Sequence, residues 1–125
     1  MKVEITDLKL RYQDEKKEIL KAVHKVLKSG KLVLSDSNLK FESVIRKFTG
    51  AKYCLGLNSG TDALMMALWS LGVGKNDEVI TSPISFVATA NSIIHVGAKP
   101  VFVDVDDVLN INPNLIERAI TKRTK

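Results

Sequence analysis

The sequence has one cysteine, three prolines and no long apolar run. The single thiol, Cys54, cannot form an internal disulfide, and its place in a predicted buried strand makes it a small hydrophobe. No stretch of about 18 apolar residues is available to span a membrane. No basic and then apolar leader opens the chain. These absences predict a cytoplasmic protein that has no membrane partner.

Positive charge is concentrated in the first third of the chain. Residues 1–52 contain 13 Lys and Arg against 7 Asp and Glu, whereas residues 53–125 contain 6 against 7. The lysines are scattered along predicted helical faces without interleaved aromatic residues, so nucleic acid is not expected as a partner. His24 and His95 have no neighbour spaced to share an ion, and the sequence therefore predicts no metal site.

The apolar pattern predicts two helices followed by alternating strands and helices. Asp14–Ser29 and Leu39–Thr49 have the 3.6-residue period of amphipathic helices, and a glycine follows each. Strands are expected at Tyr53–Leu57, Glu78–Thr81 and Pro100–Val103, and further helices at Thr61–Leu71, Ile84–Val96 and Asn114–Ile120. This alternation is typical of a parallel sheet in an α/β protein.

The segment Asn58–Leu64 joins the first predicted strand to an apolar helix through small polar residues. The first N–H groups of a helix lack intrahelical acceptors and carry partial positive charge, and Gly60 allows close approach of a bound group. The pattern therefore favours a phosphate site. The alternative is an ordinary helix start, in which Ser59 or Thr61 caps the free amides and nothing is bound.

Other phosphate-binding loops do not match this turn. A dinucleotide site requires G-x-G-x-x-G between strand and helix, and Gly60 is the only glycine here. A triphosphate-binding loop requires Gly-Lys followed by Ser or Thr, which the chain lacks. A site of monophosphate size remains.

Three further motifs follow this turn in order: Asp77–Pro83, Ser85–Asn91 and Gly97–Asp106. With Asn110–Pro113 and the ending Ala119–Lys125, they make the chain resemble the DegT/DnrJ/EryC1/StrS family of pyridoxal-phosphate-dependent sugar aminotransferases. The resemblance implies an α/β fold, namely the N-terminal part of the large domain of a fold type I (aspartate aminotransferase-like) transferase. On this basis residues 1–52 are a helical N-terminal arm, and residues 53–125 are an incomplete cofactor-binding large domain.

The resemblance also implies roles for three residues. Gly60 and Thr61 match the positions that hold the phosphate of pyridoxal phosphate, and Phe86 matches the aromatic residue that lies over its pyridine ring. For Phe86 the alternative is a plain core residue on an amphipathic helix. The implied substrates are glutamate and a keto-sugar carried on a nucleotide, and the implied assembly is a homodimer whose contacts involve the N-terminal arm.

By the resemblance, the family's enzymes are about three times longer than this chain, and their Schiff-base lysine and the aspartate that pairs with the pyridine nitrogen lie beyond Lys125. We therefore expect no catalytic residue here, and a chain that is inactive alone. One interpretation is the N-terminal portion of an aminotransferase, from an incomplete gene or a shortened chain. A second is a split or non-catalytic subunit that only binds the cofactor or its phosphate. A third is an unrelated small phosphate-binding α/β module.

Three polar residues receive structural interpretations. Asp62 lies in the first turn of a helix, where a carboxylate favours the dipole. Asp104 is expected to cap or position backbone near the site, since no third ligand completes a metal set with Asp106. Ser35 stands where the family usually has glycine, and no function is carried over to it.

Overall fold

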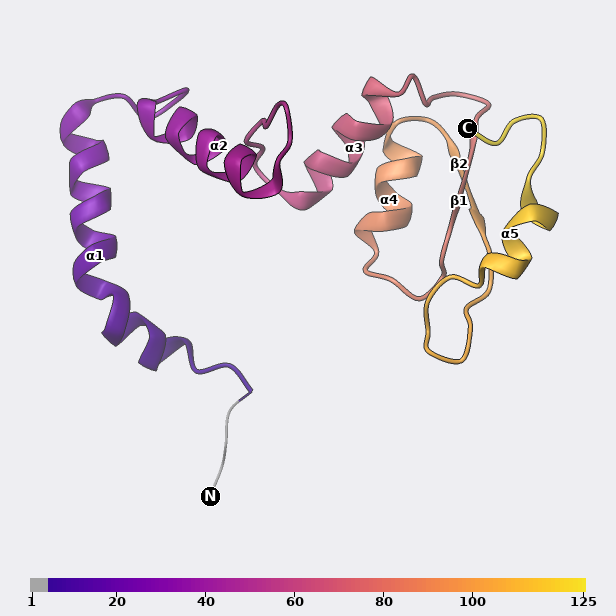
Figure 1. The fold of residues 1–125 in the computed structure, drawn as a ribbon, viewed down its shortest axis with the longest axis horizontal. Coiled ribbons are helices and arrows are strands. Elements are labelled where there is room, and N and C mark those ends of the chain that lie inside the picture. Colours follow the sequence, from indigo (N-terminus) through magenta and orange to yellow (C-terminus); the bar gives the residue numbers. More distant parts are fainter. Residues whose placement is uncertain (1–4) are drawn as a thin grey trace. The chain divides into compact units, whose positions relative to one another are not determined.

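The computed structural model describes residues 5–125 (Figure 1). Contacts divide the chain into two compact units, with the division between Gly56 and Leu57. The first unit contains α1 (Leu8–Ser29) and α2 (Asp36–Thr49). The second contains α3 (Gly60–Ser70), β1 (Glu78–Thr81), α4 (Ala88–His95), β2 (Lys99–Phe102) and α5 (Pro113–Ala119).

The two helices of the first unit begin earlier than the apolar period predicts. α1 starts at Leu8 rather than Asp14, because the Asp7 carboxylate accepts a hydrogen bond from the Leu10 amide at 2.8 Å and caps the first turn. α2 starts after Ser35, whose φ of −78° and ψ of 163° suit any residue, so serine causes no backbone strain there. No helix within residues 5–125 is long and apolar enough to cross a bilayer.

The predicted parallel pairing is confirmed for β1 and β2. Their register runs from Glu78 opposite Lys99 to Thr81 opposite Phe102. The Lys99 amide donates to the Asp77 carbonyl, directly before β1, at 2.9 Å, and the Val103 amide donates to the Thr81 carbonyl at 3.0 Å. Because alternate residues of a strand face the same neighbour, the nitrogen of Pro100 faces away from β1. A proline is tolerated in β2 for this reason.

The prediction of a strand at Tyr53–Leu57 is wrong for this structure, which has no regular secondary structure there. A strand requires a partner for its backbone groups, and no segment within residues 5–125 pairs with this one. The prediction that Cys54 is buried also fails, because the residue is only half-buried. The Gly56 amide instead donates to the Glu42 carboxylate of α2, at 2.8 Å.

The core of the second unit is small. It consists of the buried residues Val73, Ile93 and Ala98, with Leu68, Val79 and Val96 packed against them. α4 contacts α3 and both strands, so it lies between the helix that opens the unit and the sheet (Figure 1). Its one fully buried polar side chain, Ser92, donates its hydroxyl to the Thr89 carbonyl at 2.9 Å.

Large apolar surfaces remain exposed. The chain exposes 10775 Å², whereas two separately folded domains of half its mass would together expose about 8,000 Å². The stripe of α1 that the sequence marks as apolar lies open to solvent; Leu20 and Leu27, for example, are 51% and 61% exposed. Exposed apolar area of this size marks surfaces that another segment or chain covers.

We expect the purified 125-residue chain to be partly unfolded or associated at micromolar concentration. Its core is too small to offset the entropy of ordering the backbone, and its apolar stripes favour association. Sedimentation velocity and thermal unfolding followed by circular dichroism would measure both properties. A monodisperse monomer that unfolds cooperatively would contradict this prediction.

Candidate functional site

The N-terminus of α3 presents two backbone donors that the helix does not use. Ser59 is the N-cap residue, and its hydroxyl accepts a hydrogen bond from the Asp62 amide at 3.1 Å. The Ser59 carbonyl accepts from the Ala63 amide, also at 3.1 Å. Within the described residues no acceptor bonds the amides of Gly60 and Thr61. Ser59 therefore caps the helix, as expected for an ordinary helix start. The amides of Gly60 and Thr61 remain available to donate to a phosphate.

The surroundings of Gly60 are open. A Cβ atom placed on this residue would meet nothing within 4 Å, so packing within the chain does not require glycine here. Thr61 is half-buried and lies in the first turn of α3. Two amides and one hydroxyl at the positive end of a helix dipole are a donor set that suits a phosphate dianion.

Phe86 lies in a loop and not on a helix. The predicted helix Ile84–Val96 is shorter in the structure, because α4 begins only at Ala88. Ser82 accounts for part of this later start, since its hydroxyl accepts from the Ile84 amide at 3.1 Å and stabilises a turn at Pro83. Phe86 is 77% exposed, so it takes no part in the core that residues 5–125 form.

A hydrogen bond between hydroxyl groups fixes the loop that carries Phe86 to the start of α4. The Oγ atom of Ser85 lies 2.8 Å from Oγ1 of Thr89, and the Thr89 amide donates to the Phe86 carbonyl at 3.0 Å. Ser85 also lines a cavity of about 350 Å³ at the carboxyl end of β1, together with residues that include Thr81 and Asn110. In open parallel sheets ligands bind at this end of the strands.

The carboxylates that follow β2 organise their own loop. Asp104 Oδ1 accepts from the Val105 amide at 2.8 Å. Asp106 Oδ1 accepts from the amides of Val108 and Asn110, each at 3.0 Å. Both side chains therefore position the backbone of the loop beside the cavity.

The second unit therefore contains all three residues that the sequence assigns to cofactor binding. Gly60 and Thr61 open α3, Phe86 precedes α4, and these two helices pack against each other. No hydrogen bond among the described residues links Thr61 to the Phe86 loop. Sequence reasoning missed the Ser85–Thr89 bond, for which the spacing of two hydroxyl residues four positions apart was the available signal.

A profile of the DegT/DnrJ/EryC1/StrS aminotransferase family matches residues 13–125. The match covers the α3 turn and every motif that follows it. The chain belongs to this family. The resemblance inferred from the sequence motifs is thus confirmed.

The similar proteins include aminotransferases of nucleotide-linked sugars. The UDP-2-acetamido-2-deoxy-3-oxo-D-glucuronate aminotransferase of Pseudomonas aeruginosa is 43% identical over 124 residues, which are 98% of this chain and 34% of that protein. The chain thus spans about a third of the length of this relative.

Solved structures of aminotransferases have the same fold over this region. DesV of S. venezuelae, determined in complex with a ketimine intermediate, has a TM-score of 0.93 and 36% identity, over 98% of this chain and 33% of its own. NtdA of Bacillus subtilis, with the bound cofactor PMP, has a TM-score of 0.87 and 38% identity, over 90% of this chain and 26% of its own. The fold is therefore the N-terminal part of a pyridoxal-phosphate-dependent aminotransferase, as the motifs predicted.

Proposed function

We propose that this chain is the N-terminal portion of a pyridoxal-phosphate-dependent aminotransferase that transfers the amino group of glutamate to a nucleotide-linked keto-sugar. The observation that carries the proposal is the start of α3, where Ser59 caps one amide and leaves those of Gly60 and Thr61 for a phosphate. Family membership supplies the class of cofactor and substrate.

The residues of the chain fit the phosphate of the cofactor. The amides of Gly60 and Thr61 and the Thr61 hydroxyl would each donate one hydrogen bond to it. The Asp62 carboxylate repels a phosphate, and the positive end of the helix dipole, which favours both anions, offsets part of that repulsion. When bound, pyridoxal phosphate supplies the electron sink that transamination needs.

Phe86 would cover one face of the pyridine ring. Its side chain is exposed and lies in a loop, so it is available to a planar group without displacement of the core. Offset stacking of two aromatic rings contributes about 0.5–1.5 kcal/mol beyond the burial of area. The Ser85–Thr89 hydrogen bond limits the movement of the loop and so restricts where the phenyl ring lies.

Amino transfer requires a Schiff-base lysine, which the family resemblance matches to no residue of this chain. Every lysine in residues 5–125 is solvent-exposed, whereas a Schiff-base lysine works from a site that excludes water. We therefore place the catalytic lysine in the part of the enzyme that this chain does not span, and we assign no catalytic residue here. The exposed apolar stripe of α1 supports a homodimer in which the N-terminal arm is covered by the partner or by the rest of the enzyme.

The experiment that tests this function uses the complete protein, in which this chain is joined to the remaining part that its relatives contain. Purified protein would be incubated with ¹⁵N-glutamate, pyridoxal phosphate and a panel of UDP- and dTDP-linked keto-sugars. We expect ¹⁵N in at least one nucleotide-sugar product, measured by mass spectrometry. Tight cofactor binding without transfer to any sugar would favour the non-catalytic binding subunit instead.

A further inference from the structure

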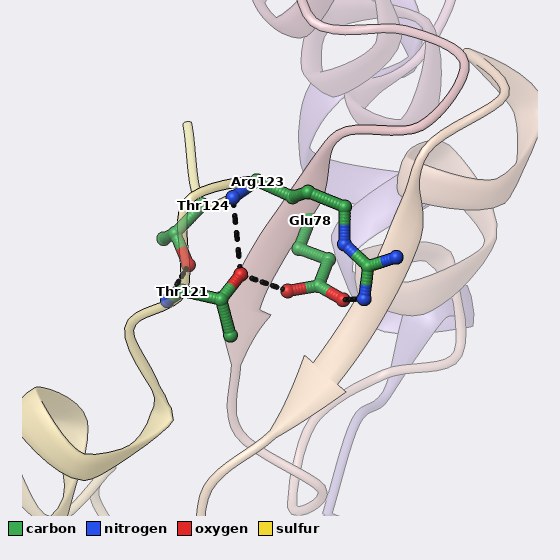
Figure 2. A network of polar contacts seen from close by, with 4 residues as sticks. All are labelled: Glu78, Thr121, Arg123 and Thr124. Carbon is green, nitrogen blue, oxygen red and sulfur yellow. Dashed lines mark hydrogen bonds and ion pairs between the residues drawn. The ribbon is translucent and has the colours of Figure 1, made fainter.

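Glu78, the first residue of β1, is a buried carboxylate outside the candidate cofactor site. The residue is only 3% exposed. Its Oε1 atom accepts a hydrogen bond from Nη2 of Arg123 and its Oε2 atom accepts one from the Thr121 hydroxyl, each at 2.6 Å (Figure 2). Both donors come from the short segment that follows α5.

The backbone of the same segment also pairs with Glu78. The Glu78 amide donates to the Arg123 carbonyl at 2.8 Å, and the Lys125 amide donates to the Glu78 carbonyl at 3.0 Å. These two bonds form a parallel bridge between Glu78 and Thr124. On the opposite edge of β1, the Asp77 carbonyl accepts from Lys99 of β2. At this point β1 therefore has a partner on both edges.

The segment is shaped by its own hydrogen bonds. The Thr121 hydroxyl oxygen accepts from the Arg123 amide at 3.1 Å, and the Thr124 hydroxyl oxygen accepts from the Thr121 amide at 2.8 Å. Figure 2 shows that this turn brings the Thr121 and Arg123 side chains to the same carboxylate. The donors are thus arranged locally, and Glu78 supplies the contact that connects them to the sheet.

We propose that Glu78 is a positioning latch whose ionised carboxylate holds Thr121–Lys125 in one parallel register on β1 and so attaches the end of α5 to the sheet. The latch is independent of the proposed cofactor site, because Gly60, Thr61 and Phe86 take no part in it. A register slip of one residue would place another side chain opposite the carboxylate and remove both of its donors.

The charges around Glu78 favour its ionised form. The hydrogen bond from Thr121 is the largest cause that lowers its pKa; burial opposes it, and Arg123 and Lys99 lower it further. Lys99 lies opposite Glu78 in β2, while the neighbouring Asp77 lies 3.9 Å from Lys125 Nζ. Because the pKa is lowered, Glu78 is ionised and holds the segment at any pH above the ordinary carboxyl pKa. The carboxylate is protonated, and its hold on the segment is lost, as the pH falls through the lowered value.

The test is amide hydrogen exchange of the complete protein, read at Glu78 and Lys125. In Glu78→Gln we expect protection of both amides at neutral pH to fall by about tenfold or more, as for loss of a hydrogen bond to a charged group. Protection in this variant should no longer decline between neutral and acidic pH. The control is Glu117→Gln, which removes an exposed carboxylate of α5. Unchanged protection in Glu78→Gln would overturn the proposal.

A second pair of variants keeps the test decisive if Glu78→Gln does not fold. Thr121→Val removes one donor to the carboxylate, so it should lower the protection of the Lys125 amide and raise the pH at which that protection is lost. Thr121→Ser keeps the hydroxyl and should restore both. Wild-type protection and an unchanged pH midpoint in Thr121→Val would show that the carboxylate does not hold the segment.

Discussion

The complete protein with Thr61→Val is expected to bind pyridoxal phosphate about 10- to 150-fold more weakly than the wild type. Valine keeps the shape of threonine and removes the hydroxyl, so the phosphate loses one hydrogen bond to a charged acceptor, about 1.5–3 kcal/mol. Cofactor absorbance during titration measures the dissociation constant. The amides of Gly60 and Thr61 remain, so binding should weaken without being abolished.

Two matched variants distinguish this effect from a general loss of stability. Thr61→Ser retains the hydroxyl and should bind nearly as the wild type does. Thr49→Val removes a hydroxyl that donates to carbonyls of its own helix, α2, and should leave affinity unchanged. Thr89→Val is unsuitable as a control, because its hydroxyl bonds to Ser85 in the loop of Phe86. Equal affinity in Thr61→Val and Thr49→Val would mean that the start of α3 is merely capped.

Phe86→Ala provides a contrasting change at the same site. Loss of stacking should alter the absorbance of the bound cofactor more than it weakens the anchoring of its phosphate. A variant that lost affinity as strongly as Thr61→Val with an unchanged spectrum would place Phe86 away from the ring.

The 125-residue chain alone is expected to show no amino transfer from glutamate to any keto-sugar nucleotide. All of its described lysines are exposed, and exposed lysines react with pyridoxal phosphate weakly and without selection. Borohydride reduction followed by peptide mapping should therefore find substoichiometric modification spread over several lysines. One dominant, stoichiometric lysine together with measurable transfer would contradict the placement of catalysis outside this chain.

The sequence predicted elements whose signals are local. The 3.6-residue period and a following glycine located the ends of α1 and α2, where Gly30 and Gly50 adopt left-handed conformations with φ of 67° and 71°. The missed start of α1 was also local, since Asp7 precedes Leu8 in the manner of an N-cap residue. Recognition of that pattern would have corrected the boundary.

The failures concern interactions between distant residues. Tyr53–Leu57 has strand-like composition, yet β propensity reflects the fit to neighbouring strands, and none within residues 5–125 pairs with it. The contacts of Glu78 with Thr121 and Arg123 span 43 and 45 positions, so no period or spacing in a single sequence marks them. In the sequence, Glu78 stands out only as part of a family motif and as the first residue of a predicted strand.

At the candidate site, one feature could be predicted from the local sequence and another could not. The turn at Ser59–Thr61 is local, and its chemistry follows from the physics of helix ends together with the capping bond that the structure adds. The position of Phe86 in a loop was not predicted. The apolar residues from Ile84 onward have helical spacing, but the hydrogen bond between Ser82 and Ile84 forms a turn at Pro83, and α4 begins only at Ala88. The exposure of Phe86 within this chain could not be predicted from the sequence either, because it depends on which segments pack around that loop.

A structure of the complete protein with bound pyridoxal phosphate tests the central assignment most directly. We expect phosphate oxygens within hydrogen-bonding distance, about 2.7–3.2 Å, of the amides of Gly60 and Thr61, with Ser59 still capping Asp62. A cofactor whose phosphate is held by another part of the protein, with these two amides bonded only to water, would contradict the account.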